Sequence, residues 1–158
     1  MQNPGVVSVF RIAAALQMST AELMAEALAS LGLQRGFVVH GAGGLDEIST
    51  TGESLVLEIQ RGAIAHHTLT PQDFGVKTAK IADLRGGERD ANLSIARAIL
   101  SGEPGPKRDI VLVNASAALV AAGKATGFLH GVELAAESID SGRAREKVKH
   151  LARFSQIV

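Results

Sequence analysis

The sequence contains no cysteine, tryptophan or tyrosine, and its only aromatic side chains are five phenylalanines. The absence of cysteine excludes disulfides, cysteine-ligated zinc and a thiol nucleophile. The scarcity of aromatic rings argues against a surface that stacks nucleic-acid bases. Neither sign of charge is in excess, because 16 Lys and Arg balance 16 Asp and Glu over 158 residues. Since nucleic-acid-binding proteins usually concentrate basic residues, we expect no nucleic-acid partner.

Long apolar runs are also missing, and none approaches the roughly 20 residues that a membrane-spanning helix needs. The amino end has no basic region followed by an apolar core, the pattern of a secretory signal. We therefore expect no membrane partner and a cytoplasmic location. Hydrophobic residues make up 46% of the chain and charged residues 20%, which excludes wholesale disorder. The length predicts one domain over residues 1–158.

Capping signals and apolar periodicity locate the first elements. Ser19 and Glu22 have the spacing of a capping box and predict a helix that ends near Gly32. Residues 6–16 are apolar without a clear period, so helix and strand both stay open there. Residues 37–40 are apolar on both faces and predict a strand of a covered parallel sheet, followed by a glycine-rich loop.

The remaining elements are predicted from turn residues. Residues 54–60 and 63–70 are strand candidates whose two-residue connection, Arg61-Gly62, fits a hairpin. Thr70 and Pro71 predict an N-cap and the first position of a short helical turn. Further helices are expected over residues 90–100, 106–122, 128–139 and 144–154, with Ser141 as the cap of the last. Residues 110–113 (Ile-Val-Leu-Val) favour a strand by propensity alone, so the helix after Pro106 is contestable.

The loop from Gly41 to Glu47 is the most conspicuous candidate for chemistry. Its small residues allow a nest of backbone N–H groups that could hold an anion. Two adjacent carboxylates, Asp46 and Glu47, could hold Mg²⁺, which takes oxygen ligands and often bridges to phosphate oxygens. The loop lacks the Gly-Lys-Ser/Thr ending of a Walker A motif and the third glycine of a dinucleotide fingerprint. From spacing alone, a tight turn with two solvated acids is the commoner outcome.

Other polar residues are expected to be structural. His66 and His67 cannot share a metal ion on a strand, because adjacent side chains point to opposite faces, so we expect one inward and one outward. His40 is expected to fix the glycine-rich loop by a hydrogen bond rather than to act as a base. No Gly-x-Ser-x-Gly elbow supports a hydrolase. A basic cluster near the carboxyl end is expected to be a solvated helix face: Arg143, Arg145, Lys147, Lys149 and Arg153.

Residues 38–49, Val-Val-His-Gly-Ala-Gly-Gly-Leu-Asp-Glu-Ile-Ser, closely resemble the metal-binding segment of the anthranilate phosphoribosyltransferases, which are nucleoside-phosphorylase-like glycosyltransferases. Further stretches match in the same order: residues 69–75 (Leu-Thr-Pro-Gln-Asp-Phe-Gly), 84–87 (Leu-Arg-Gly-Gly) with Asn92, 102–109 (Gly-Glu-Pro-Gly-Pro-Lys-Arg-Asp), 113–115 (Val-Asn-Ala) and 136–142 (Ala-Glu-Ser-Ile-Asp-Ser-Gly). The resemblance extends from about residue 19 to 154, and it identifies the chain as a member of this family.

The resemblance implies a Mg²⁺-dependent step of tryptophan biosynthesis, in which anthranilate displaces pyrophosphate from phosphoribosyl pyrophosphate (PRPP). In the family the Asp of this segment holds one Mg²⁺ and the adjacent Glu reaches both, and these roles fall on Asp46 and Glu47. Mg²⁺ suits the chemistry because it neutralises the charge of departing pyrophosphate. The chain has Gly43 where relatives often have Asp, but the two ligand positions are intact.

Length is the main departure, because family members are roughly twice as long and the match covers only their carboxyl-terminal half. The amino-terminal helical domain, which usually supplies the homodimer contact, the glycine-rich phosphate loop and the anthranilate-contacting arginine all precede the matched region. No catalytic or substrate-binding residue is therefore assigned. The expected fold is α/β, a partial sheet flanked by helices that is a remnant of the large domain, with an unpaired edge and uncovered apolar surface.

Two functions follow from this resemblance. In the first, the chain is an incomplete phosphoribosyltransferase that is inactive unaided and needs a complementary amino-terminal half. In the second, it is a non-catalytic subunit or interaction module that pairs with a separate chain carrying the phosphate loop.

Overall fold

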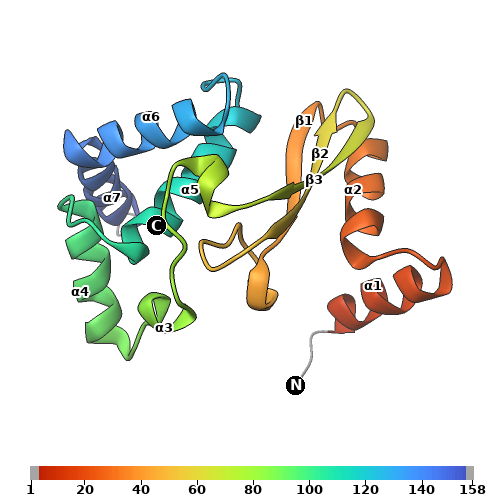
Figure 1. The fold of residues 1–158 in the computed structure, drawn as a ribbon, viewed down its shortest axis with the longest axis horizontal. Helices are drawn as coiled ribbons and strands as arrows, with labels where there is room; N and C mark the ends of the chain where they lie inside the picture. Colours follow the sequence, from red (N-terminus) through yellow and green to blue (C-terminus); the bar gives the residue numbers. More distant parts are fainter. Residues whose placement is uncertain (1–3, 156–158) are drawn as a thin grey trace.

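A three-stranded sheet lies at the centre of the molecule, with helices on both of its faces (Figure 1). The computed structural model describes residues 4–155. Its strands are β1 (Arg35–His40), β2 (Ser54–Gln60) and β3 (Ala63–Leu69). Its helices are α1 (Pro4–Ala15), α2 (Thr20–Ser30), α3 (Ile81–Leu84), α4 (Arg89–Leu100), α5 (Pro106–Ala121), α6 (Phe128–Asp140) and α7 (Arg143–Phe154), with short 3-10 turns η1 (Ala42–Gly44) and η2 (Pro71–Phe74).

The sheet is antiparallel throughout, in the order β1-β2-β3. Val38 pairs with Leu57, and Val56 pairs with His67 across the predicted hairpin. The hairpin is confirmed, whereas the expectation of a parallel sheet is wrong. Helices cover both faces of β1, so its residues are apolar on both sides although its neighbour runs antiparallel.

Each face of the sheet carries its own apolar core. On one face, α2 packs against the strands through a cluster of Ala25, Val38, Leu57 and Ile59. On the other, α5 and α6 pack against it through Ile48, Val56, Phe74, Val113 and Ala117, with Phe37 and Phe128 at the margin. Of the helices after Pro106, α5 contacts this face and α6 adds Phe128 at its amino end, whereas α7 packs against α6.

The capping box at the start of α2 is confirmed. The Glu22 backbone N–H donates to Ser19 Oγ at 3.1 Å, and the Ser19 N–H donates to Glu22 Oε2 at 2.8 Å. These bonds, above all the one from the Ser19 backbone, lower the pKa of the Glu22 carboxyl. Gly32 takes the left-handed conformation that the sequence predicts, with φ +86°.

Helix α5 settles the contestable segment in favour of a helix. Pro106 stands at its amino end, and residues 110–113 are helical despite their β-branched composition. Leu112 and Val113 are both buried, the first towards α6 and the second towards the sheet. Burial on two sides outweighs the weak local preference for a strand.

Two further expectations have different outcomes. Residues 6–16, left open between helix and strand, fall almost wholly within α1. The prediction of Ser141 as the cap of the last helix is wrong, because Gly142 caps α7 in a left-handed conformation with φ +79° and Ser141 ends α6.

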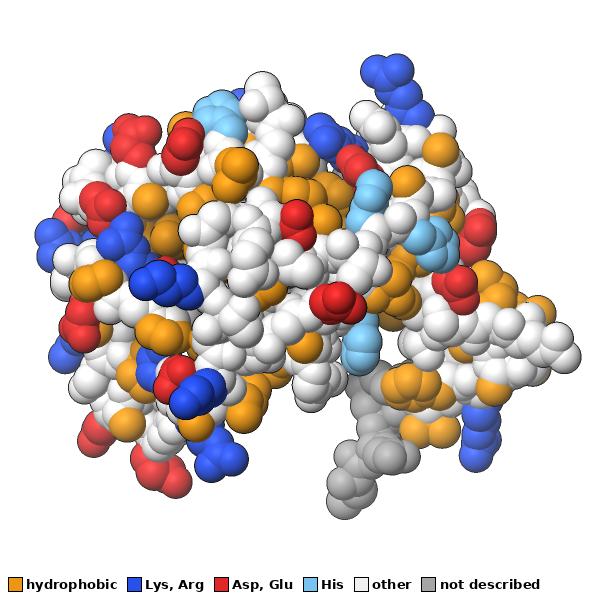
Figure 2. Space-filling model, in the orientation of Figure 1, with side chains coloured by type: hydrophobic (Ala, Val, Ile, Leu, Met, Phe, Trp, Pro, Cys, Tyr) orange, Lys and Arg blue, Asp and Glu red, His pale blue; other side chains and the backbone are white. Residues whose placement is uncertain are grey.

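Apolar side chains remain uncovered at both ends of the described chain. They include Phe10 and Ile12 on α1, and Val148, Leu151 and Phe154 on α7. Within residues 4–155 no strand pairs with the outer side of β1. None of the helices in this range is long and apolar enough to cross a membrane. Apolar patches also show between the charged side chains over one face of the molecule (Figure 2).

Candidate functional site

The glycine-rich loop turns the chain back directly after β1. The Gly41 N–H donates to the Leu45 carbonyl at 2.8 Å, and the Gly44 N–H donates to the Gly41 carbonyl at 3.1 Å. Gly43 and Gly44 make this turn with φ of +74° and +80°, values that glycine adopts without strain. Two N–H groups of the predicted anion nest are therefore occupied within the loop itself.

Asp46 and Glu47 follow this turn and lie side by side in the chain. Asp46 is exposed and Glu47 is half-buried. Among residues 4–155 neither carboxylate has an ion-pair or hydrogen-bond partner. Burial, and secondly the charge of Asp46, raise the pKa of the Glu47 carboxyl. A cation near these two unpartnered carboxylates would relieve their mutual repulsion.

The donor set fits Mg²⁺ better than a closed structural metal centre. No group of three or more His, Cys, Asp or Glu side chains converges on one point in the described part of the chain. A cation here would have two protein carboxylates and would take its other oxygens from water and from a phosphate-bearing ligand. Mg²⁺ is usually bound in this way, through one or two carboxylates with several retained waters.

The segment after the carboxylates is buried and tightly bonded. Ile48, Ser49 and Thr50 are each at most 1% exposed. The Ser49 N–H donates to Ser54 Oγ at 2.9 Å, and the Thr50 carbonyl accepts the Ala79 N–H at 2.8 Å. The carboxylates thus extend from a fixed stretch of backbone rather than from a free loop.

Sequence reasoning missed a second partner of this segment, Asn114 on α5. Its side chain forms hydrogen bonds to both the N–H and the carbonyl of Ile48, each at 2.9 Å. Two signals point to it: residues 113–115 match the family, and an asparagine stands in the interior of a helix, where it is disfavoured unless its side chain has a partner.

The histidines do not join the site. His40 is exposed at the end of β1, and its imidazole forms no hydrogen bond with the described residues, so the expected loop-fixing bond is absent. His66 and His67 are both exposed, which corrects the expectation that one points inward. Both stay accessible because β3 is an edge strand beyond the covering helices. His67 Nε2 lies 3.5 Å from Glu58 Oε2, and Glu58 also pairs with Arg35 at 3.3 Å.

The basic cluster is a solvated helix face, as expected. All five of its side chains are exposed on α7. Arg143 pairs with Glu137 at 2.9 Å and Lys149 with Glu146 at 2.6 Å. These charges are therefore partly neutralised by neighbouring acids.

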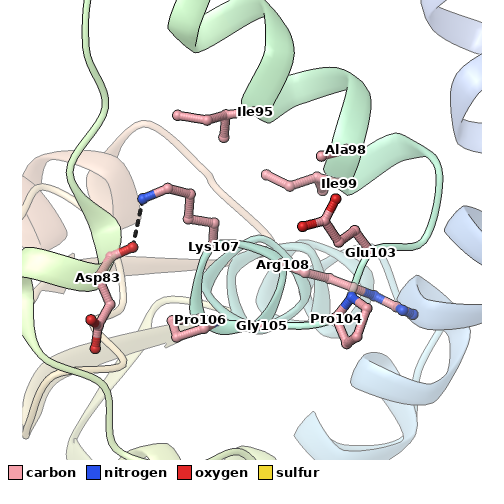
Figure 3. Close-up of a pocket in the computed structure, with 10 residues that line it drawn as sticks. All are labelled: Asp83, Ile95, Ala98, Ile99, Glu103, Pro104, Gly105, Pro106, Lys107 and Arg108. Carbon is pink, nitrogen blue, oxygen red and sulfur yellow. Dashed lines mark hydrogen bonds between the residues drawn. The ribbon is translucent and has the colours of Figure 1, made fainter.

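A cavity of about 270 Å³ lies between α4 and the start of α5, away from the two carboxylates (Figure 3). Lys107 extends beside it and donates to the carbonyls of Asp83 and Arg85, at 2.5 and 2.7 Å. Asp46 and Glu47 do not line this cavity. Lys107 holds the segment before α4 in place and has no carboxylate partner in the described structure.

This fold and loop define a class of protein. The model of the family described as "Glycosyl transferase family, a/b domain" matches residues 2–145, and the chain belongs to this family. Within it, the chain is 59% identical over 135 residues to anthranilate phosphoribosyltransferase of Solibacter usitatus, and 48% identical over 130 residues to that of Geobacter sulfurreducens.

Solved structures agree with these sequence relatives. Anthranilate phosphoribosyltransferase from Thermus thermophilus superposes with a TM-score of 0.76 at 40% identity, over 85% of this chain and 39% of that one. The Saccharomyces cerevisiae enzyme in complex with PRPP and Mg superposes with a TM-score of 0.74 at 26% identity, over 83% of this chain and 38% of that one.

The chain spans only part of these proteins. The matched residues make up 85% of this chain but 40% of the Solibacter usitatus relative, and 82% against 37% for the Geobacter sulfurreducens relative. The matched residues thus correspond to about two fifths of the relatives' length.

Proposed function

We propose that this chain supplies the metal-binding part of an anthranilate phosphoribosyltransferase, with Asp46 and Glu47 as ligands of Mg²⁺. The observation that carries the proposal is the pair of unpartnered carboxylates on a fixed backbone, in a chain 59% identical to a relative of that name. The match to a yeast enzyme whose structure contains PRPP and Mg supports the choice of substrate and ion.

The proposed reaction breaks the bond between C1 of the ribose and the pyrophosphate oxygen. The amine of anthranilate forms the new bond to C1 and loses a proton, and pyrophosphate leaves. A bound Mg²⁺ would neutralise the charge that develops on the leaving group. Asp46 and Glu47 would hold that ion.

We further propose that these 158 residues cannot perform the transfer unaided. The site has two proposed metal ligands and no assigned group that would orient ribose or anthranilate. Positioning two substrates supplies much of the rate in such reactions. The rest of the relatives' length, including their phosphate loop and their helical dimer-forming domain, would supply those contacts.

A non-catalytic interaction module is the second candidate, and the uncovered apolar side chains of α1 and α7 favour it. Such surface is typical of a protein-protein interface. This candidate predicts stable pairing with a chain that carries the phosphate loop, without any need for the two carboxylates.

The deciding experiment is a steady-state assay of anthranilate and PRPP with Mg²⁺. The purified chain is assayed alone and with a separately expressed amino-terminal half of a relative. Activity in the mixture alone is expected. Activity of the chain alone would contradict the claim that it is insufficient, and a stable but inactive mixture would favour the interaction module.

The double variant Asp46→Asn, Glu47→Gln tests the residue assignment. We expect it to abolish activity in the mixture while changing the free energy of unfolding by less than about 0.5 kcal/mol, because neither carboxylate has a partner to lose. Glu53→Gln, another exposed acid near the loop, serves as the control. Full activity of the double variant would exclude these residues as the metal ligands.

A further inference from the structure

We infer that Asn114 is a positioning residue that sets the direction of the two carboxylates by fixing the backbone at Ile48. This inference rests on the proposed function, because it concerns the same metal site. Asn114 touches neither carboxylate, so its effect is transmitted through the peptide that follows Glu47.

The geometry is a closed clamp. The Ile48 N–H donates to Asn114 Oδ1 at 2.9 Å, and Asn114 Nδ2 donates to the Ile48 carbonyl at 2.9 Å. The same Nδ2 also donates to the carbonyl of Ile110 at 2.9 Å, one turn earlier in α5. Both backbone groups of Ile48 are thereby held by one half-buried side chain that is itself anchored to its helix.

The side chain of Ile48 is held by the same helix. It is 1% exposed and packs in the cluster that contains Val113, the residue before Asn114. Consecutive residues of α5 therefore fix the backbone and the side chain of the residue that follows Glu47. Neither rotation nor translation of that peptide is possible without breaking contacts with α5.

Gly41 limits the peptide from the opposite side. A methyl group at Gly41 would collide with the backbone carbonyl oxygen of Glu47. The Glu47–Ile48 peptide is thus confined between the end of β1 and α5. Such confinement matters for Mg²⁺, whose ligands must come close to ideal octahedral geometry.

A second asparagine provides a matched control. Asn92 accepts from the Gly87 N–H at 2.8 Å and donates to the Gly87 carbonyl at 2.7 Å. It forms the same type of two-bond clamp on one residue, in a loop that does not carry the carboxylates. Removing it should affect its own loop and leave the metal site unchanged.

The first test measures backbone amide exchange by NMR in the wild type, Asn114→Ala and Asn92→Ala. In Asn114→Ala we expect exchange at Ile48 to accelerate roughly tenfold, the effect of losing a hydrogen bond to a buried group, relative to Leu57 in the central strand. A merely structural role would accelerate both amides together. Asn114→Leu, which loses both the acceptor and the donor but keeps a side chain of similar size, gives a second reading if the alanine variant folds poorly. Unchanged protection of Ile48 in both variants would overturn the clamp.

The second test titrates the same proteins with Mn²⁺ alone, as a paramagnetic substitute for Mg²⁺. We expect line broadening centred on Asp46 and Glu47 in the wild type and Asn92→Ala, and at least about threefold more Mn²⁺ for the same broadening in Asn114→Ala. Equal titrations for wild type and Asn114→Ala would overturn the positioning role while leaving the proposed function intact. Broadening that persists in the double variant Asp46→Asn, Glu47→Gln would instead overturn the metal assignment, and so would its absence from the wild type. Either result would also overturn the positioning role.

Discussion

At the scale of single residues, Gly41 packs closely against the backbone of Glu47, one of the two proposed ligands. Its φ is −85°, so glycine is not needed there for its conformation. It is needed for space, because a Cβ atom would meet the Glu47 carbonyl oxygen and would also lie 3.1 Å from Ser49 Cβ. A backbone oxygen cannot move aside as the end of a flexible side chain can.

Gly41→Ala is therefore expected to lower the free energy of unfolding by about 1–3 kcal/mol, the usual cost of an overpacked site. Urea denaturation measures the change. Gly43→Asn is the control, because the space beside Gly43 is open and asparagine tolerates its left-handed conformation. If the two variants were equally stable, the close approach of Gly41 to Glu47 would be contradicted.

Sequence reasoning at this scale finds residues whose chemistry is local. Asp46 and Glu47 are recognisable because two acids follow a glycine-rich turn and match a family motif. Asn114 is not, because its partner Ile48 lies 66 residues earlier in the chain. The exposure of both His66 and His67 cannot be predicted from the sequence either, since it depends on how far the helices extend over β3.

At the scale of elements, the turn η2 shows how a short helical segment is defined by its cap. Asp73 Oδ2 accepts hydrogen bonds from the backbone N–H and the hydroxyl of Thr70, both at 2.7 Å. These bonds, the backbone one first, lower the pKa of the Asp73 carboxyl. Pro71 and Phe74 are buried in the same turn, so the cap fixes core residues as well as the backbone.

Because the pKa of Asp73 is lowered in the folded state, its contribution to stability is present above the ordinary carboxyl pKa of about 4 and is lost as the pH falls through the lowered value. We expect Asp73→Asn to be less stable than wild type near about pH 7 and the difference to shrink towards about pH 2. Denaturation series across this range measure it. Gln72→Ala, at the exposed neighbouring position, should show no such convergence. A difference that stays constant with pH would contradict the cap.

Elements with strong local signals are predictable here, and their mutual arrangement is less so. The capping box of α2, the two-residue hairpin connection and Pro106 each place an element boundary from sequence alone. The direction of β1 relative to β2 does not follow from its apolar residues, because those residues report burial and not strand orientation. Residues 110–113 show the converse, since their strand propensity is overridden by packing on both sides of α5.

At the scale of the whole molecule, several apolar side chains remain uncovered on the surface. Val148, Leu151 and Phe154 on α7 are 50, 67 and 68% exposed. Apolar patches of this kind drive association in water. Leu151 and Phe154 are mostly exposed, so little of the packing of α7 depends on their being apolar.

We therefore expect the isolated chain to self-associate as its concentration rises. The double variant Leu151→Gln, Phe154→Gln should reduce this association. The free energy of unfolding should change by less than about 0.5 kcal/mol, as for other surface substitutions. Sedimentation equilibrium measures the association. The matched control is the double variant Lys147→Gln, Arg153→Gln, whose substitutions lie on the same helix. Equal association of all three proteins would show that this surface is not responsible.

The 66-residue separation between Ile48 and Asn114 also has a consequence for the order of folding. The β2–β3 hairpin closes over two residues and can form early, whereas bringing Asn114 to Ile48 closes a long loop at a higher entropic cost. The peptide behind the carboxylates is therefore completed only after α5 has been synthesised and docked. During translation, a nascent chain that ends before α5 would carry both acids without their final geometry, so the proposed cation site would form only after α5 has docked.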